Sequence, residues 1–165
     1  MGFDAETGPG RGLAMDYLEC KNASDVTSYC NQFWTNLQAT NNEKAIADAT
    51  SMFNSIKGAA SMYNGALGRK QAGRIIASVS DQGEVVGLMR LKDEGARMHL
   101  MNVVGVPGAG GGQALIDLAK AIAMSVSKPL ELEAADAELL DYYGKRNFVV
   151  TAGSTMRWAV ENKLG

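Results

Sequence analysis

The stretch that decides the fold is residues 103–115, VVGVPGAGGGQAL, in which a β-branched strand sequence runs through glycines straight into the start of a helix. Glycines leave no side chain in the way of a ligand, and the first N–H groups of a helix are unpaired at the positive end of its dipole. The stretch is therefore a candidate anion cradle, the kind of loop that holds a phosphate. A tight strand-to-helix connection without a ligand is the alternative that the glycines alone leave open.

Two other phosphate-binding loops do not match this stretch. A P-loop ends in Gly-Lys-Ser/Thr, whereas Gly112 is followed by Gln113 and Ala114. A dinucleotide fingerprint that starts at Gly108 would need its third glycine at position 113, and it would open a βαβ unit. Here the loop follows three strands that the hairpin turns at 80–84 and 93–95 predict to be antiparallel.

Working outward from the loop, hydrophobic periodicity and turn residues predict the remaining elements. Before the loop we expect a strand over 13–19, a helix capped by Ser24, a helix capped by Asn41 or Asn42 that ends at Gly58, and strands over 75–79, 85–89 and 98–106. After it we expect a helix over 111–127, a strand over 130–134, a short helix from Asp136 to Arg146, and strands over 148–151 and 155–160.

Composition predicts one domain with a full hydrophobic core. The chain has 165 residues, of which 46% are hydrophobic, and this length supports a core without metals or disulfides. Residues 1–12 are rich in glycine and are interpreted as a flexible lead-in, which leaves 13–165 as the domain. The 16 basic and 18 acidic residues give a net charge of -2, which disfavours nucleic acid as a partner.

Cysteine usage and hydropathy indicate the compartment. Cys20 and Cys30 lack any metal-ligand spacing, so we expect two buried thiols and no metal. The N-terminus lacks a basic and apolar leader, and the longest apolar stretch, 114–126, is interrupted by Asp117 and Lys120. We therefore expect a cytoplasmic protein that does not associate with membranes.

Residues 108–115, GAGGGQAL, resemble the acetyl-CoA loop of the GNAT acetyltransferase superfamily in its Gly-x-Gly-x-Gly-x-x-Leu form. A second segment, from Asp136 through YYGKRNF at 142–148, is similar to the second motif of that family. The resemblance implies a mixed α/β fold with a central, mostly antiparallel sheet, splayed between its fourth and fifth strands and flanked by helices.

Three positions depart from the family pattern. Pro107 stands where the family prefers Gln or Arg, and it removes one N–H donor from the mouth of the loop. Asp136 replaces an Asn and remains a good helix N-cap, and Asn147 replaces a Gly and tolerates a left-handed backbone. The amides of residues 108–113 stay available, so binding should survive.

The resemblance implies an N-acetyltransferase that moves an acetyl group directly from acetyl-CoA, its co-substrate, to the amine of a small molecule or a protein. It assigns the binding of acetyl-CoA to a set of residues along the strand, the loop and the two following helices. These are Val104, Val106, Gly108, Ala109, Gly110, Gly111, Gly112, Gln113, Asp136 and Tyr143.

For the chemistry, Tyr143 is the candidate proton donor to the departing thiolate, with Tyr142 in reserve, and a backbone N–H near Val104 is implied to hold the oxyanion. The predicted fourth strand carries no carboxylate. His99, the single histidine, is the candidate base, and Glu19 and Glu84 are weaker ones.

Other functions remain open at this point. A non-catalytic acyl-CoA-binding module would keep the loop without the chemistry, and a GNAT toxin would acetylate aminoacyl-tRNA. The basic residues Arg69, Lys70 and Arg74 are either a site for an acidic substrate or a solvated helix end. A homodimer through the final strand is also open.

Overall fold

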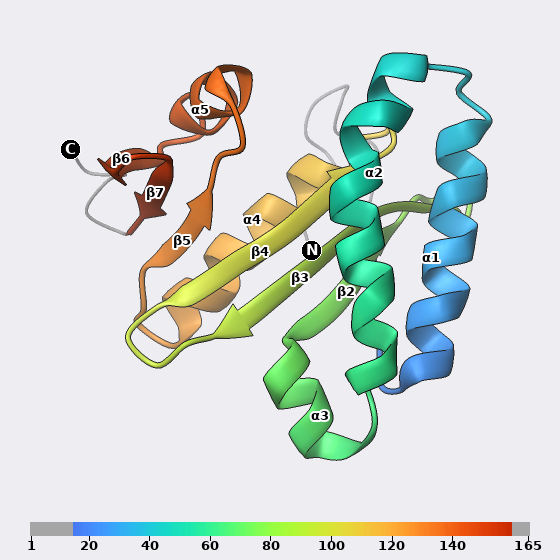
Figure 1. Ribbon diagram of the computed structural model, residues 1–165, viewed down its shortest axis with the longest axis horizontal. Helices are drawn as coiled ribbons and strands as arrows, with labels where there is room; N and C mark the ends of the chain where they lie inside the picture. The colour runs from blue at the N-terminus through green and yellow to red at the C-terminus, as the bar shows by residue number, and fades with distance from the viewer. Residues whose placement is uncertain (1–14, 160–165) are drawn as a thin grey trace.

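The computed structural model describes residues 15–159, which form one sheet with helices on both faces (Figure 1). In chain order the elements are β1 (Asp16–Glu19), α1 (Ala23–Gln38), α2 (Glu43–Gly58), a 3₁₀ turn (Ala59–Met62), α3 (Gly65–Ala72), β2 (Arg74–Val79), β3 (Val85–Asp93), β4 (Met98–Gly105), α4 (Gly111–Ser125), β5 (Leu130–Glu133), α5 (Ala137–Gly144), β6 (Val149–Ala152) and β7 (Thr155–Trp158). The expected lead-in and the ends of the first and last predicted strands, at 13–14 and 160, lie outside the described residues.

The seven strands are arranged in the order β1-β2-β3-β4-β5-β7-β6. All neighbouring pairs are antiparallel except β4 and β5, which are parallel. The mixed α/β class and the mostly antiparallel sheet expected from the sequence are confirmed.

The core has two layers, one on each face of the sheet. Helices α1 and α2 cover one face, where the α1 stripe of Val26, Phe33 and Leu37 is fully buried. Helix α4 covers the other face together with α5, and its Leu115 and Ile116 pack against β3, β4 and β5. Each layer follows from the three-to-four spacing of apolar residues along its helices.

The start of α1 differs from the expectation. Asn22, and not Ser24, is the N-cap: its side chain accepts a hydrogen bond from the N–H of Asp25 at 2.9 Å, and its own backbone is extended. Asn is as good an N-cap as Ser, so the residue whose backbone leaves the helix decides between them. Asn42 caps α2 in the same way, by accepting from Ala45.

Helix α3 and the 3₁₀ turn before it were not predicted. The α3 sequence, GALGRKQA, contains two glycines and little apolar periodicity, so the tertiary context overrides a weak local preference. Its Arg69 donates to the carbonyl of Lys21 at 2.8 Å, and Arg74 forms a two-point ion pair with Glu19. Two of the three basic residues, Arg69 and Arg74, are therefore held by contacts within the domain.

Glycines bring the start of α4 against the sheet. A Cβ atom on Gly105 would lie 2.7 Å from the backbone nitrogen of Gly112, and one on Gly111 would overlap the carbonyl oxygen of Val86. The buried Ser78 hydroxyl donates to the Gly111 carbonyl at 3.1 Å. The first turn of α4 is therefore fixed at the ends of β3 and β4 by backbone contact.

The sheet is open between β4 and β5. These strands pair only at Met98 with Leu130 and at His99 with Glu131. Beyond this point β4 pairs with β3 alone, and an extra residue in β4, Met101, makes a bulge that bends the strand. The expected splay between the fourth and fifth strands is confirmed, and it exposes one edge of β4.

Candidate functional site

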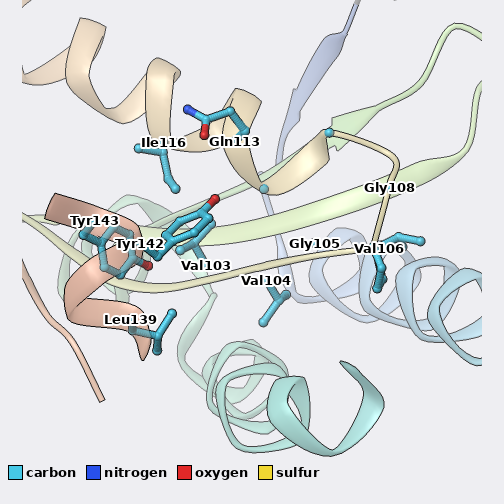
Figure 2. Close-up of a pocket in the computed structure, with 13 residues that line it drawn as sticks. Val103, Val104, Gly105, Val106, Gly108, Gln113, Ile116, Leu139, Tyr142 and Tyr143 are labelled. Carbon is cyan, nitrogen blue, oxygen red and sulfur yellow. The ribbon is translucent and has the colours of Figure 1, made fainter. Parts of the chain in front are cut away.

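A cavity of about 390 Å³ lies at this splay, between β4, α4 and α5 (Figure 2). Tyr142 and Tyr143 project from α5 toward β4, and Ile116 of α4 points toward the two rings. The complete lining is Val103, Val104, Gly105, Val106, Pro107, Gly108, Gly110, Gly112, Gln113, Ile116, Leu139, Tyr142 and Tyr143. We call it the loop cavity.

The glycine loop forms one wall of the loop cavity. Gly108 and Gly110 have φ angles of 77° and 80°, in the left-handed region that suits glycine, and Gly110 is the N-cap of α4. The amides in the first turn of a helix have no acceptor within the helix, and no side chain caps α4 in their place. Free amides at a helix N-terminus, facing a cavity without obstructing side chains, fit an anionic group such as a phosphate.

The structure brings most of the sequence-predicted binding residues together. Seven of them line the loop cavity, namely Val104, Val106, Gly108, Gly110, Gly112, Gln113 and Tyr143. Ala109 and Gly111 belong to the same turn without lining it, and Asp136 lines a neighbouring cavity instead. Their binding roles stay predictions.

The register of β4 corrects which backbone groups face the splay. The N–H of Val106 donates to the Val86 carbonyl of β3 at 2.9 Å. Antiparallel pairs alternate, so the N–H of Val104, opposite Leu88, also points toward β3. The groups that point to the open edge belong to Val103 and Gly105, and not to Val104 and Val106 as expected.

A second cavity, also of about 390 Å³, lies on the α2 side of β4. We call it the α2 cavity. Its lining is Ala45, Asp48, Ala49, Ser51, Met52, Val103, Val104, Gly105, Ala135, Asp136, Glu138, Leu139 and Tyr143. It shares residues 103–105, Leu139 and Tyr143 with the loop cavity, so the two cavities meet between the open edge of β4 and α5.

Tyr143 lies at this meeting point. Its side chain is only 4% exposed, and its ring packs edge-on against Tyr142 and Phe148 with centroids 5.2 and 5.5 Å apart. Burial, and next the neighbouring Tyr142, raise the pKa of Tyr143 to about 12. This raised pKa keeps the hydroxyl protonated at neutral pH. Among residues 15–159 no hydrogen-bond acceptor holds that proton, so it is available to a ligand.

The predicted bases lie elsewhere. His99 is at the closed end of the splay, with Nδ1 3.0 Å from a carboxylate oxygen of Glu94, and lines neither cavity. Glu19 pairs with Arg74, and Glu84 is exposed in the turn between β2 and β3.

Sequence reasoning missed the carboxylates that do lie at the site, Asp48 and Glu138. The sequence held one signal for Asp48. It lies three residues after Ala45 and four before Met52, and this spacing puts the three residues on the same face of a helix. Glu138 follows the predicted cap Asp136, in the first turn of α5.

Among residues 15–159 there is no cluster of three or more His, Cys, Asp or Glu side chains arranged to hold a metal ion. None of the helices there is long and apolar enough to cross a membrane.

Comparison with known proteins identifies the fold. The sequence matches no family model and no curated protein. A structure described as histone acetyltransferase HPA2 and related acetyltransferase, from Corynebacterium glutamicum ATCC 13032, matches with a TM-score of 0.56 and 15% identity, over 88% of this chain and 96% of that one. The KacTA–DNA complex matches with a TM-score of 0.55 and 17% identity, over 90% and 94%. The protein has the GNAT acetyltransferase fold, as its two motifs predicted.

Proposed function

We propose that the protein is an N-acetyltransferase that transfers an acetyl group directly from acetyl-CoA to an amine. The observation that carries the proposal is the meeting of two cavities at Tyr143 and residues 103–105. Direct transfer needs a thioester and an amine within contact distance of each other, and two cavities that share a wall provide for that.

The loop cavity would take acetyl-CoA. The amides between Gly108 and Gln113, except that of Ala109, would bind the pyrophosphate at the positive end of α4. The N–H of Ala109 is not available as the sequence predicted, because it donates to the Val106 carbonyl at 3.1 Å. The open-edge groups of Val103 and Gly105 would bind the amides of the pantetheine arm, as an added strand binds a sheet edge.

Acetyl-CoA supplies an activated thioester, and the reaction forms a C–N bond and breaks the C–S bond to give an amide and the CoA thiol. The one of the two open-edge N–H groups, of Val103 or of Gly105, that the pantetheine arm does not use would donate to the carbonyl oxygen as it gains negative charge. Tyr143 would donate its proton to the leaving sulfur and recover one from the amine nitrogen through water. The high pKa of Tyr143 suits a donor and not a base.

Carboxylates at the mouth of the α2 cavity disfavour an aminoacyl-tRNA acceptor, because they repel a phosphate backbone. The two buried free thiols support a reducing compartment such as the cytoplasm. The final strand β7 pairs with β5 on one side and β6 on the other, so it has no free edge for the homodimer that the sequence left open. A homodimer would have to use the edge strand β6, where Val149 and Val150 are exposed, and it stays a prediction.

The decisive experiment combines CoA binding by calorimetry with thiol release from acetyl-CoA over a panel of amines. We expect binding and amine-dependent release, and Tyr143→Phe should lower kcat about 100-fold with unchanged CoA affinity. Tyr142→Phe is the matched control. Binding without release for any amine would favour the non-catalytic module, and absence of binding would reject the proposal.

A further inference from the structure

We propose that the acceptor is a small diamine, whose second ammonium group is held by Asp48 and Glu138 at the mouth of the α2 cavity. The inference rests on the proposed acetyl transfer and names the substrate class of that reaction. It starts from the charges that line the cavity. The lining contains the carboxylates Asp48, Asp136 and Glu138 and no basic side chain.

Two of these carboxylates are available to a ligand. Asp136 is occupied, because its side chain accepts from the N–H of Leu139 as the cap of α5. Asp48 on α2 and Glu138 on α5 approach the mouth from opposite sides. The ammonium of Lys44 lies between them, 2.7 Å from Asp48 and 3.5 Å from Glu138. The chain itself thus shows that the two carboxylates hold one ammonium group.

An independent observation marks the other end of the cavity. The Tyr143 side chain lies at the inner wall and is 4% exposed, and its hydroxyl makes no hydrogen bond to another group among residues 15–159. A hydroxyl that lines a cavity and has no protein partner there is able to meet a ligand. The reacting amine fits there, beside the open edge of β4.

The lining between these ends is mostly apolar. Ala45, Ala49 and Met52 of α2 face Val104 and Leu139 across the cavity. Methylene groups suit such a wall, and a cation suits its outer rim. A short alkyl chain with an amine at each end matches both features, whereas a monoamine leaves the rim carboxylates to Lys44.

Lys44 then competes with the substrate for its binding site. Its side chain is 69% exposed, and an ion pair so exposed is weak, so a substrate ammonium can displace it. Removal of the Lys44 charge should therefore improve diamine binding. A merely structural role of the ion pair would predict no such gain.

The test compares 1,5-diaminopentane with 1-aminopentane, which has the same chain length and lacks the second charge. We expect kcat/KM to favour the diamine by about tenfold in the parent protein. Asp48→Asn and Glu138→Gln should each raise KM for the diamine about three- to tenfold, with little change in KM for the monoamine. Lys44→Met should lower KM for the diamine. The matched control is Asp141→Asn, which removes an equally exposed carboxylate of α5 that pairs with Lys145 and lines neither cavity.

Calorimetry of 1,5-diaminopentane with the CoA-saturated protein separates this inference from the proposed function. Diamine binding that Asp48→Asn weakens and Asp141→Asn leaves intact supports the rim site, even if no turnover is found and acetyl transfer is rejected. Equal use of the two amines, or equal effects of Asp48→Asn and Asp141→Asn, overturns the diamine site and leaves acetyl transfer standing.

Discussion

Arg146 lies over the ring of Tyr142, with its guanidinium carbon 3.5 Å from the ring centroid. The same guanidinium donates to the side chain of Gln113 in the first turn of α4 and to the Tyr142 carbonyl at 2.8 Å. One cation therefore ties α5 to the helix that bears the glycine loop. Tyr142 and Gln113 both line the loop cavity, so Arg146 positions two of its walls.

Arg146→Ala should weaken CoA binding about tenfold, because it removes the stacking on Tyr142, the bond to Gln113 and a positive charge near the anion cradle. Calorimetry with CoA measures the change. Lys145→Ala is the control, since it removes the same charge from a side chain that is exposed and pairs with Asp141. Equal losses in the two variants would show that only net charge matters.

Gly105→Ala should destabilise the fold by about 1–3 kcal/mol, because the added Cβ would lie 2.7 Å from the Gly112 nitrogen, a backbone atom that cannot swing away. Gly58→Ala is the control. A Cβ there meets nothing within 4 Å, and alanine in a helix raises stability by up to about 1 kcal/mol. Urea unfolding measures both, and equal midpoints would contradict the close contact between β4 and α4.

The parts of the fold that the sequence predicted are those with strong local signals. The hairpin turns, the helix stripes and the glycine loop each act within a few residues, and the two motifs placed the splay beside that loop. Helix α3 was missed, because its glycines hide a helix that only packing supports. The α1 cap was misplaced by two residues, because Asn22 and Ser24 are equally good caps.

The candidate site was predictable on the loop side and not on the acceptor side. Loop residues are consecutive, so a motif can report them. Asp48 and Glu138 are 90 residues apart, and only the packing of α2 and α5 along β4 brings them together. The orientation of the β4 amides depends on the pairing with β3, and a one-residue difference in that register reverses which groups face the splay.

The rate of turnover should increase with pH and should not decrease again at high pH. Burial raises the pKa of Tyr143 to about 12, so the proton donor stays protonated throughout the accessible range. The acceptor must be neutral to attack, and an alkyl amine titrates near pH 10, so kcat/KM should increase about tenfold per pH unit from about pH 7 to 9. A falling limb centred near pH 8 would show that some other group is the acid.

The buried thiols should make the fold less stable in alkali. Burial raises the pKa of Cys20 to about 12 and that of Cys30 to about 11, whereas an unfolded thiol ionises near about pH 8.5. Between these values the folded state binds more protons. The stabilisation is therefore fully present below about pH 8.5 and is lost as pH rises toward 11 and 12, by up to about 1.4 kcal/mol per pH unit for each thiol.

Urea unfolding of the parent and of Cys20→Ala/Cys30→Ala at a series of pH values from about 7 to 10.5 measures this effect. The double variant should be less stable at neutral pH, because it leaves small cavities, and it should lose less stability as the pH rises. The buried tyrosines are present in both proteins, so the difference between the two curves isolates the thiols. Parallel curves would mean that the thiols ionise equally in the folded and unfolded chains.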